Sequence, residues 1–204
     1  MVSSIYNGMP FESAWEDGGS GGPGASRSAS FIGLFVLLAG CVMVFGAFTG
    51  AFVFRRGLSG DWASMPKPPI LLVNTAVLLA SSLALERARR ALKAGIRPKF
   101  NAWWSAGATL GVLFLLGQAL AWRQLKDLGI YVASSPSSSF FYVLTASHAF
   151  HLLGGLAALM YVAVRSLRPS LGPARRTVVD ISAIFWHFLD GLWVYLMVLF
   201  YVWG

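Results

Sequence analysis

The sequence predicts an all-α integral membrane protein built as a bundle of five transmembrane helices. Of its 204 residues, 56% are hydrophobic and only 12% are charged, and the mean hydropathy is +0.65. A soluble domain of this size could not bury that much apolar surface. Long uncharged runs also separate the charged residues, and each run can cross the roughly 30 Å of hydrocarbon in a bilayer.

The uncharged runs locate the helices in order. Residues 31–54 hold no charge, the second run ends at Glu86, and the third lies between Lys99 and Arg123. The fourth run, 128–164, is longer than one helix needs, so the turn-rich segment YVASSPSSS is expected to precede a helix there. We therefore expect helices at residues 31–54, 69–92, 100–122, 139–164 and 177–203.

The N-terminal segment differs in composition from the rest of the chain. Residues 1–30 are polar and include the stretch GGSGGPGASRSAS, a composition typical of flexible tails. The segment lacks a basic start followed by an apolar core, so we do not expect a signal peptide. We expect a flexible cytoplasmic tail at 1–30 and one membrane domain at 31–204, in which the loop 87–99 begins as a helical extension.

The distribution of basic residues predicts the orientation in the membrane. If the N-terminus lies inside, the inner segments hold eleven of the sixteen Lys and Arg residues and the outer segments hold five. This excess is the positive-inside pattern, and it predicts a cytoplasmic N-terminus and an external C-terminus. The net charge of +8 is therefore a topology signal, and nucleic acid is not an expected partner.

Cysteine and histidine usage limits metal chemistry. Cys41 is the only cysteine, which excludes an intramolecular disulfide. His148 and His151 stand three positions apart, a spacing that can ligate a metal or a haem iron. Alternatively, each hydrogen-bonds a neighbouring helix or a carbonyl within the bundle. A closed metal site needs ligands from several helices, and no further cluster is evident. We therefore expect structural contacts, and no metal, cofactor-binding or catalytic residue in this chain.

The last expected helix carries two ionisable residues at membrane depth. His187 and Asp190 are three positions apart and share one helical face. Asp190 lies about 20 Å from a helix start near Thr177, close to mid-bilayer. Ionisable groups at that depth usually face protein. They can pair with each other, bond a neighbouring helix or serve a proton relay, and we favour a structural or subunit-docking polar cluster.

Other polar side chains within the spans suit close helix packing and interhelical hydrogen bonds; they are Asn74, Thr75, Ser81, Ser82 and Gln118. Glu86 lies near the expected inner interface beside Arg87, Arg89 and Arg90, where we expect an ion pair at headgroup level. The candidate contacts with lipid or with a partner subunit are Glu86, Cys41, Trp186 and Trp193.

Several motifs follow one another along the chain. The last helix carries Asp180, WHFLD at 186–190, Trp193 and YVWG at 201–204. The earlier helices carry LVNT (72–75), SS (81–82), Gln118, FF (140–141), Thr145 and HAFH (148–151). In this order and spacing, residues 31–204 resemble subunit III of haem–copper terminal oxidases, in the shorter five-helix bacterial form.

The chain departs from that family's pattern at its acidic positions. Cys41 stands where the first helix of the family usually has a buried glutamate, which is implicated in lipid contact and proton supply. Ala121 replaces the acid that follows the third-helix glutamine, and Asp180 is shorter than the family's glutamate. The two lost carboxylates argue against a proton-supply role at those positions.

The resemblance implies a non-catalytic subunit of a cytochrome c oxidase in a bacterial inner membrane. It would support dioxygen reduction and proton translocation by a catalytic subunit I, beside subunit II and membrane phospholipids, with haem and copper held by its partners. An accessory protein of a nitric oxide reductase or quinol oxidase is the first alternative. A small stand-alone transporter is the second, although the sequence shows no inverted repeat.

Overall fold

The computed structural model describes residues 23–58, 68–166 and 173–203. These residues form five α-helices: α1 (Pro23–Leu58), α2 (Ile70–Lys93), α3 (Arg97–Asp127), α4 (Pro136–Ser166) and α5 (Pro173–Trp203). All five are long and apolar enough to cross a membrane. The predicted all-α architecture with five membrane helices is confirmed for the described part of the chain.

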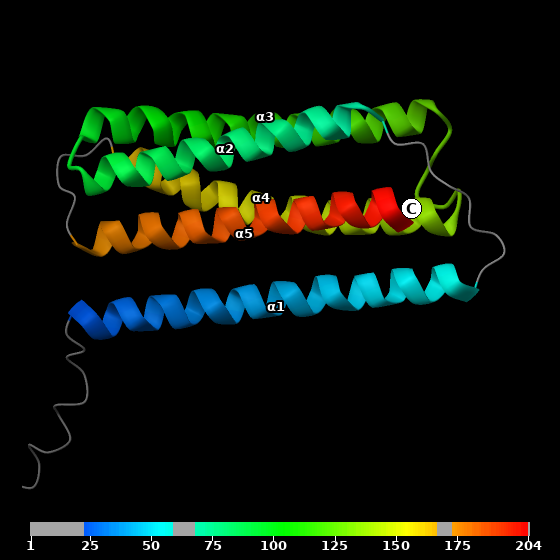
Figure 1. The fold of residues 1–204 in the computed structure, drawn as a ribbon, viewed down its shortest axis with the longest axis horizontal. Helices are drawn as coiled ribbons and strands as arrows, with labels where there is room; N and C mark the ends of the chain where they lie inside the picture. The colour runs from blue at the N-terminus through cyan, green and yellow to red at the C-terminus, as the bar shows by residue number, and fades with distance from the viewer. Residues whose placement is uncertain (1–22, 59–67, 167–172, 204) are drawn as a thin grey trace, which may run out of the picture.

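Four helices make a compact body, and α1 lies along one side of it (Figure 1). The hairpin α2–α3 packs closely, α4 pairs with α5, and further contacts join α2 to α5 and α3 to α4. Among the described helices, α1 contacts α4 and α5 but neither α2 nor α3. The first helix therefore borders the body on one side only and keeps most of its surface exposed.

Local sequence signals fix the ends of several helices. Gly95 and Gly129 have φ values of 74° and 77° and follow the ends of α2 and α3. After each glycine, the next residue donates its backbone N–H to a carbonyl five residues back, as Ile96 does to Ala91, which is the Schellman ending. Ser135 and Ser138 cap α4 reciprocally, each hydroxyl accepting the other's backbone N–H at 3.2 and 3.0 Å.

The helices extend beyond the uncharged runs. α1 begins at Pro23, inside the segment expected to be a flexible tail, and α3 continues to Asp127. α2 continues to Lys93, so the loop 87–99 begins as the helical extension that the sequence predicted. Uncharged runs mark only the hydrocarbon-spanning part, whereas Lys and Arg at helix ends extend their charged groups into the interface. Residues 1–22 of the tail expected at 1–30, and residues 59–67 between α1 and α2, lie outside the described residues.

Asn74 and Ser81 hold the α2–α3 hairpin together. Asn74 Nδ2 donates to the Phe114 carbonyl at 3.0 Å, and Ser81 Oγ donates to the Gly107 carbonyl at 2.8 Å. Glycine allows this approach, because a Cβ on Gly117 would lie 2.3 Å from Asn74 Oδ1. Small residues at such contacts are how membrane helices bring their backbones together.

Candidate functional site

A row of polar contacts, which we call the polar seam, runs along the α2–α5 interface. Its α2 members, Thr75, Ser82 and Arg89, are seven residues apart and therefore lie on one helical stripe. Its α5 members contact them in reverse order, as antiparallel packing requires. The pairs are Thr75 with Trp193, Ser82 with His187, and Arg89 with Asp180.

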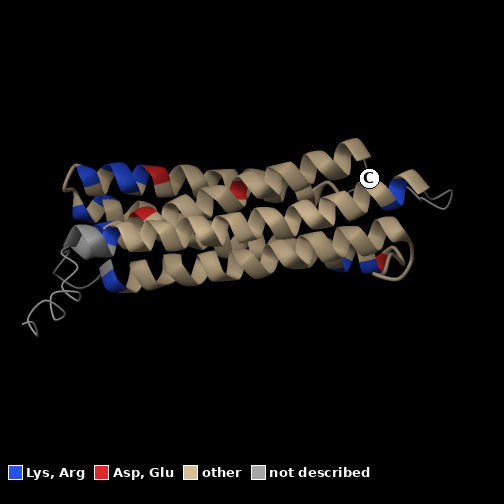
Figure 2. Cartoon of the chain, turned by 90° about the horizontal axis from the view of Figure 1, so that it is seen from below, with Lys and Arg blue, Asp and Glu red and all other residues tan. Residues whose placement is uncertain are grey.

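The bonds of the seam change from neutral to ionic toward the basic end of the bundle. Trp193 Nε1 donates to Thr75 Oγ1 at 2.9 Å, and the Ser82 hydroxyl is hydrogen-bonded to His187 Nδ1. Arg89 donates from Nε and Nη2 to one Asp180 oxygen at 3.2 and 3.1 Å. Figure 2 shows that end of the bundle crowded with Lys and Arg.

Glu86 belongs to the ionic end of the seam. Its two carboxylate oxygens accept from Arg89 at 3.2 Å and from Arg90 at 3.1 Å. The Glu86 side chain is 36% exposed, so it can also contact lipid headgroups or a partner. Arg89 thus forms ion pairs with Glu86 of its own helix and with Asp180 of α5. The first is the ion pair expected for Glu86, and the second extends it to another helix.

Asp190 lies beside the seam and inside the bundle. It is 4% exposed, and neither of its carboxylate oxygens makes a hydrogen bond of ordinary geometry with a described residue. His187 bonds Ser82 of the neighbouring helix rather than Asp190. The sequence predicted that His187 and Asp190 share one helical face. It did not predict that His187 bonds Ser82 of α2.

The two histidines of α4 have different surroundings. His148 is fully buried and packs against Phe114 and Trp193, with ring centroids 6.2 and 5.1 Å away. His151 bonds through Nδ1 to the Ser147 carbonyl of its own helix at 2.7 Å and meets the edge of Phe45 of α1. They do not converge on one point. In the described ranges, no group of three or more His, Cys, Asp or Glu side chains could hold a metal ion.

Three of the expected lipid or subunit contacts are instead interior residues. Trp186 and Trp193 are 0% exposed and Cys41 is 3% exposed, so none reaches lipid or a partner subunit. Trp186 fits against Gly111, where an added Cβ would lie 2.6 Å from its ring. The sequence pattern shows aromatic residues in a membrane helix, but only the facing glycine decides that this tryptophan points inward.

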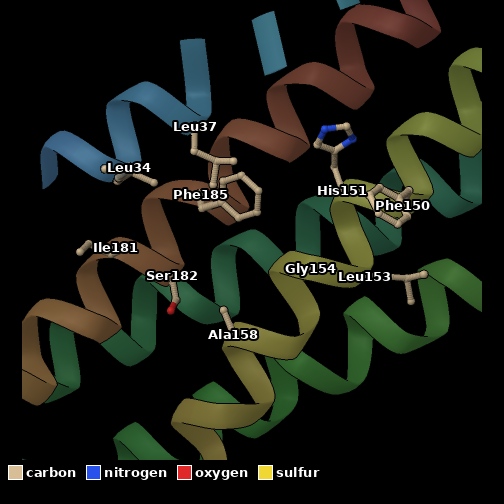
Figure 3. Close-up of a pocket in the computed structure, with 11 residues that line it drawn as sticks. Leu34, Leu37, Phe150, His151, Leu153, Gly154, Ala158, Ile181, Ser182 and Phe185 are labelled. Atoms are coloured by element: carbon tan, nitrogen blue, oxygen red, sulfur yellow. The ribbon is translucent and has the colours of Figure 1, made fainter. Parts of the chain in front are cut away.

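An apolar groove of about 570 Å³ separates part of α1 from α4 and α5 (Figure 3). α1 contributes Leu34 and Leu37, α4 contributes Phe150 and Leu153, and α5 contributes Phe185 and others. His151 and Ser182 are its polar residues. Sequence reasoning did not find this groove, because its lining consists of ordinary membrane residues. Its shape and composition suit a hydrocarbon chain rather than a polar ligand.

A second groove of about 400 Å³ lies farther along the same side, between α1 and α5. Among the described residues, aromatic contacts and a hydrogen bond join α1 to α4 and α5 beyond the second groove. Phe52 meets Phe140 and Phe200 at 5.6 and 6.2 Å, and the Tyr195 hydroxyl donates to Thr49 Oγ1 at 3.0 Å. The α1 side of the protein therefore offers space to a ligand.

The five apolar helices define a multi-pass membrane protein in which several polar residues bond helix to helix. Comparison with known proteins identifies the family, since the family model described as cytochrome c oxidase subunit III matches residues 30–204. Over 177 residues, the chain is 32% identical to the probable cytochrome c oxidase subunit 3 of Mycobacterium tuberculosis, covering 83% of this chain and 86% of the relative.

Two further relatives agree. The cytochrome c oxidase subunit 3 of Corynebacterium diphtheriae is 32% identical over 176 residues, covering 83% of this chain and 86% of the relative. That of Thermostichus vulcanus is 30% identical over 175 residues, covering 84% and 86%. The chain belongs to the cytochrome c oxidase subunit III family, which confirms the resemblance seen in its motifs.

Proposed function

We propose that this chain supports the catalytic subunit of a respiratory haem–copper oxidase as its subunit III. It packs against the haem- and copper-bearing subunit I, in a complex that also contains subunit II. That complex reduces dioxygen to water with electrons from cytochrome c and translocates protons. Haem and copper belong to the partner subunits, and this chain supplies structure and bound lipid. The family match over residues 30–204 is the observation that carries this proposal.

The contacts of the intramembrane polar residues support a structural role. Asn74, Ser81, Ser82 and His187 are all engaged in bonds between helices. A proton relay would need a continuous polar path across the membrane. The ionic end of the polar seam is partly exposed, but Asp190 is buried within the bundle. The seam is therefore a brace between α2 and α5.

The charge distribution supports a cytoplasmic N-terminus in a bacterial inner membrane. The start of α1, the α2–α3 turn and the adjoining ends of α4 and α5 carry most of the basic residues (Figure 2). Basic segments remain on the cytoplasmic side during insertion. An odd number of spans then places the C-terminus on the outer side.

The groove between α1, α4 and α5 is proposed to hold an acyl chain of a membrane phospholipid. Its walls are apolar, and exposed Arg27, Arg165 and Arg176 lie at the cytoplasmic ends of the same three helices. Arg27 is seven residues before Leu34, about 10 Å along the helix. The basic residues are therefore placed to attract the phosphate of a lipid whose chain enters the groove.

Purification in mild detergent through a tag on this chain tests the assignment. We expect haem absorption and a large haem-bearing partner to co-purify with it, together with oxygen consumption on reduced cytochrome c. A colourless, isolated protein would contradict the assignment. A complex that reduces nitric oxide, or that accepts electrons from quinol alone, would replace it with an accessory role in another haem–copper enzyme.

A further inference from the structure

Gln118 of α3 and His148 of α4 are buried with all their side-chain polar atoms unpartnered. They are 1% and 0% exposed, and none of the described residues bonds the Gln118 amide or either ring nitrogen of His148. In a membrane interior such groups are destabilising unless something satisfies them. Neither belongs to the polar seam or to the lining of the two grooves.

The register of α3 and α4 places these two side chains at the same depth. Trp104 Nε1 donates to the Leu159 carbonyl at 2.9 Å, and Trp122 Nε1 donates to Thr145 Oγ1 at 3.2 Å. Between these two antiparallel contacts, position 118 lies opposite position 148. Phe114, one turn from Gln118 on the same helix, meets the His148 ring edge-on at 6.2 Å.

Among the described residues, the side chains in ring contact with His148 are aromatic, and the hydroxyl group one turn before it on α4 already has partners. Phe114 and Trp193 present aromatic rings to His148, and the Trp193 N–H is committed to Thr75. The Thr145 hydroxyl donates to the Phe141 carbonyl and accepts from Trp122. The amide has donors and an acceptor, and neutral imidazole has one of each. A water molecule can both donate and accept hydrogen bonds, and buried water typically bonds polar groups that have no protein partner.

We propose that Gln118 and His148 form an internal water site that joins α3 to α4 in the centre of the four-helix body. At least one water molecule bonds the Gln118 amide and a ring nitrogen of His148. It connects the two helices between their direct bonds at Trp104 and Trp122. The site is independent of the partner subunits and of the lipid proposed for the groove.

Radiolytic labelling of the intact purified complex tests for the water directly. A brief X-ray pulse makes hydroxyl radicals from water in place, and mass spectrometry locates the oxidised side chains. We expect Phe114 and Trp193 to be oxidised. The matched control is the pair Phe100 and Trp104, which are also 0% exposed and stacked at 5.5 Å, and which should stay unmodified. Equal protection of both pairs would overturn the proposal.

A double-mutant cycle tests whether the two residues share the site. Gln118→Met and His148→Phe are close in volume to the originals, and each alone leaves the other residue with an incomplete set of bonds. We expect the double variant to lower the thermal midpoint of the complex by less than the sum of the two single losses. The control pairs Gln118→Met with His151→Phe, which should be additive.

The outcomes of the two experiments separate the alternatives. Additive losses for Gln118→Met and His148→Phe would show that the residues share nothing, and would overturn the site. Coupled losses without oxidation of Phe114 or Trp193 would show a direct bond between the two side chains, and would overturn the water. We expect coupled losses, together with oxidation of Phe114 and Trp193 in the wild type. That oxidation should disappear in the double variant. The wild-type labelling stands by itself if a variant does not assemble.

Discussion

Replacing Gly117 by alanine tests how closely α3 approaches α2. An added Cβ would lie 2.3 Å from Asn74 Oδ1 and 2.9 Å from Asn74 Cγ. Neither distance is possible, so the Asn74 side chain or the helix must move. Overpacking of this kind costs about 1–3 kcal/mol. Moving Asn74 also breaks its bond to the Phe114 carbonyl, and an unsatisfied buried group adds about 1–3 kcal/mol.

The two effects together predict a loss of about 2–6 kcal/mol for Gly117→Ala. For a chain of this size, 1 kcal/mol shifts the thermal midpoint by about 2–4 °C, so we expect a drop of at least about 4 °C. The midpoint would be measured on the purified complex by unfolding in detergent. Adding Asn74→Ala removes the clashing atoms and should recover part of the loss.

Gly40→Ala is the matched control. Gly40 also lies within a helix, but nothing is within 4 Å of its added Cβ, and alanine is the better helix former. This variant should match the wild type or exceed it slightly. A Gly117→Ala protein that unfolds at the wild-type temperature would refute the close approach of the two helices, and with it the packing that orients Asn74 and Ser81.

Three further predictions concern the seam and the groove. His187→Phe and Ser82→Ala should each destabilise the complex and show a coupling of about 0.6–1.7 kcal/mol in a double-mutant cycle, whereas zero coupling would contradict their bond. Arg89→Ala should lower the stability of the complex by under about 1 kcal/mol, because the Arg89–Asp180 pair is partly exposed. This loss of stability should be smaller in high salt. A loss that does not depend on salt would argue against an ionic contribution. Gly154→Phe should fill the groove and reduce the amount of bound phospholipid measured by native mass spectrometry. Gly40→Phe, at a position outside the groove lining, should not reduce it. Equal lipid retention by the two variants would contradict the proposed occupant.

The polar residues of the second helix show how far sequence reasoning extends. Asn74, Thr75, Ser81 and Ser82 were expected to make interhelical hydrogen bonds, and each takes part in one. Their partners could not be predicted. Asn74 and Ser81 face α3, whereas Thr75 and Ser82 face α5. A shift of one position along α2 changes the neighbouring helix, and that assignment depends on how three helices pack together.

The tryptophans of the last helix show the opposite case. Trp186 and Trp193 were expected at the lipid or subunit surface, and both are completely buried. Aromatic residues are common both at membrane surfaces and in tightly packed interiors, so composition does not separate the two. The deciding features are Gly111, which makes room for the Trp186 ring, and His148, which packs on Trp193.

The sequence by itself determined the number of spans, their approximate positions and the family. These properties depend on hydrocarbon thickness, on the spacing of charges and on motif order, all of which can be read along one chain. Only the tertiary structure decided which side chains meet across helices, which aromatic residues are buried and where α1 leaves grooves. Those features depend on the distance and register between helices, which glycine contacts and specific hydrogen bonds set.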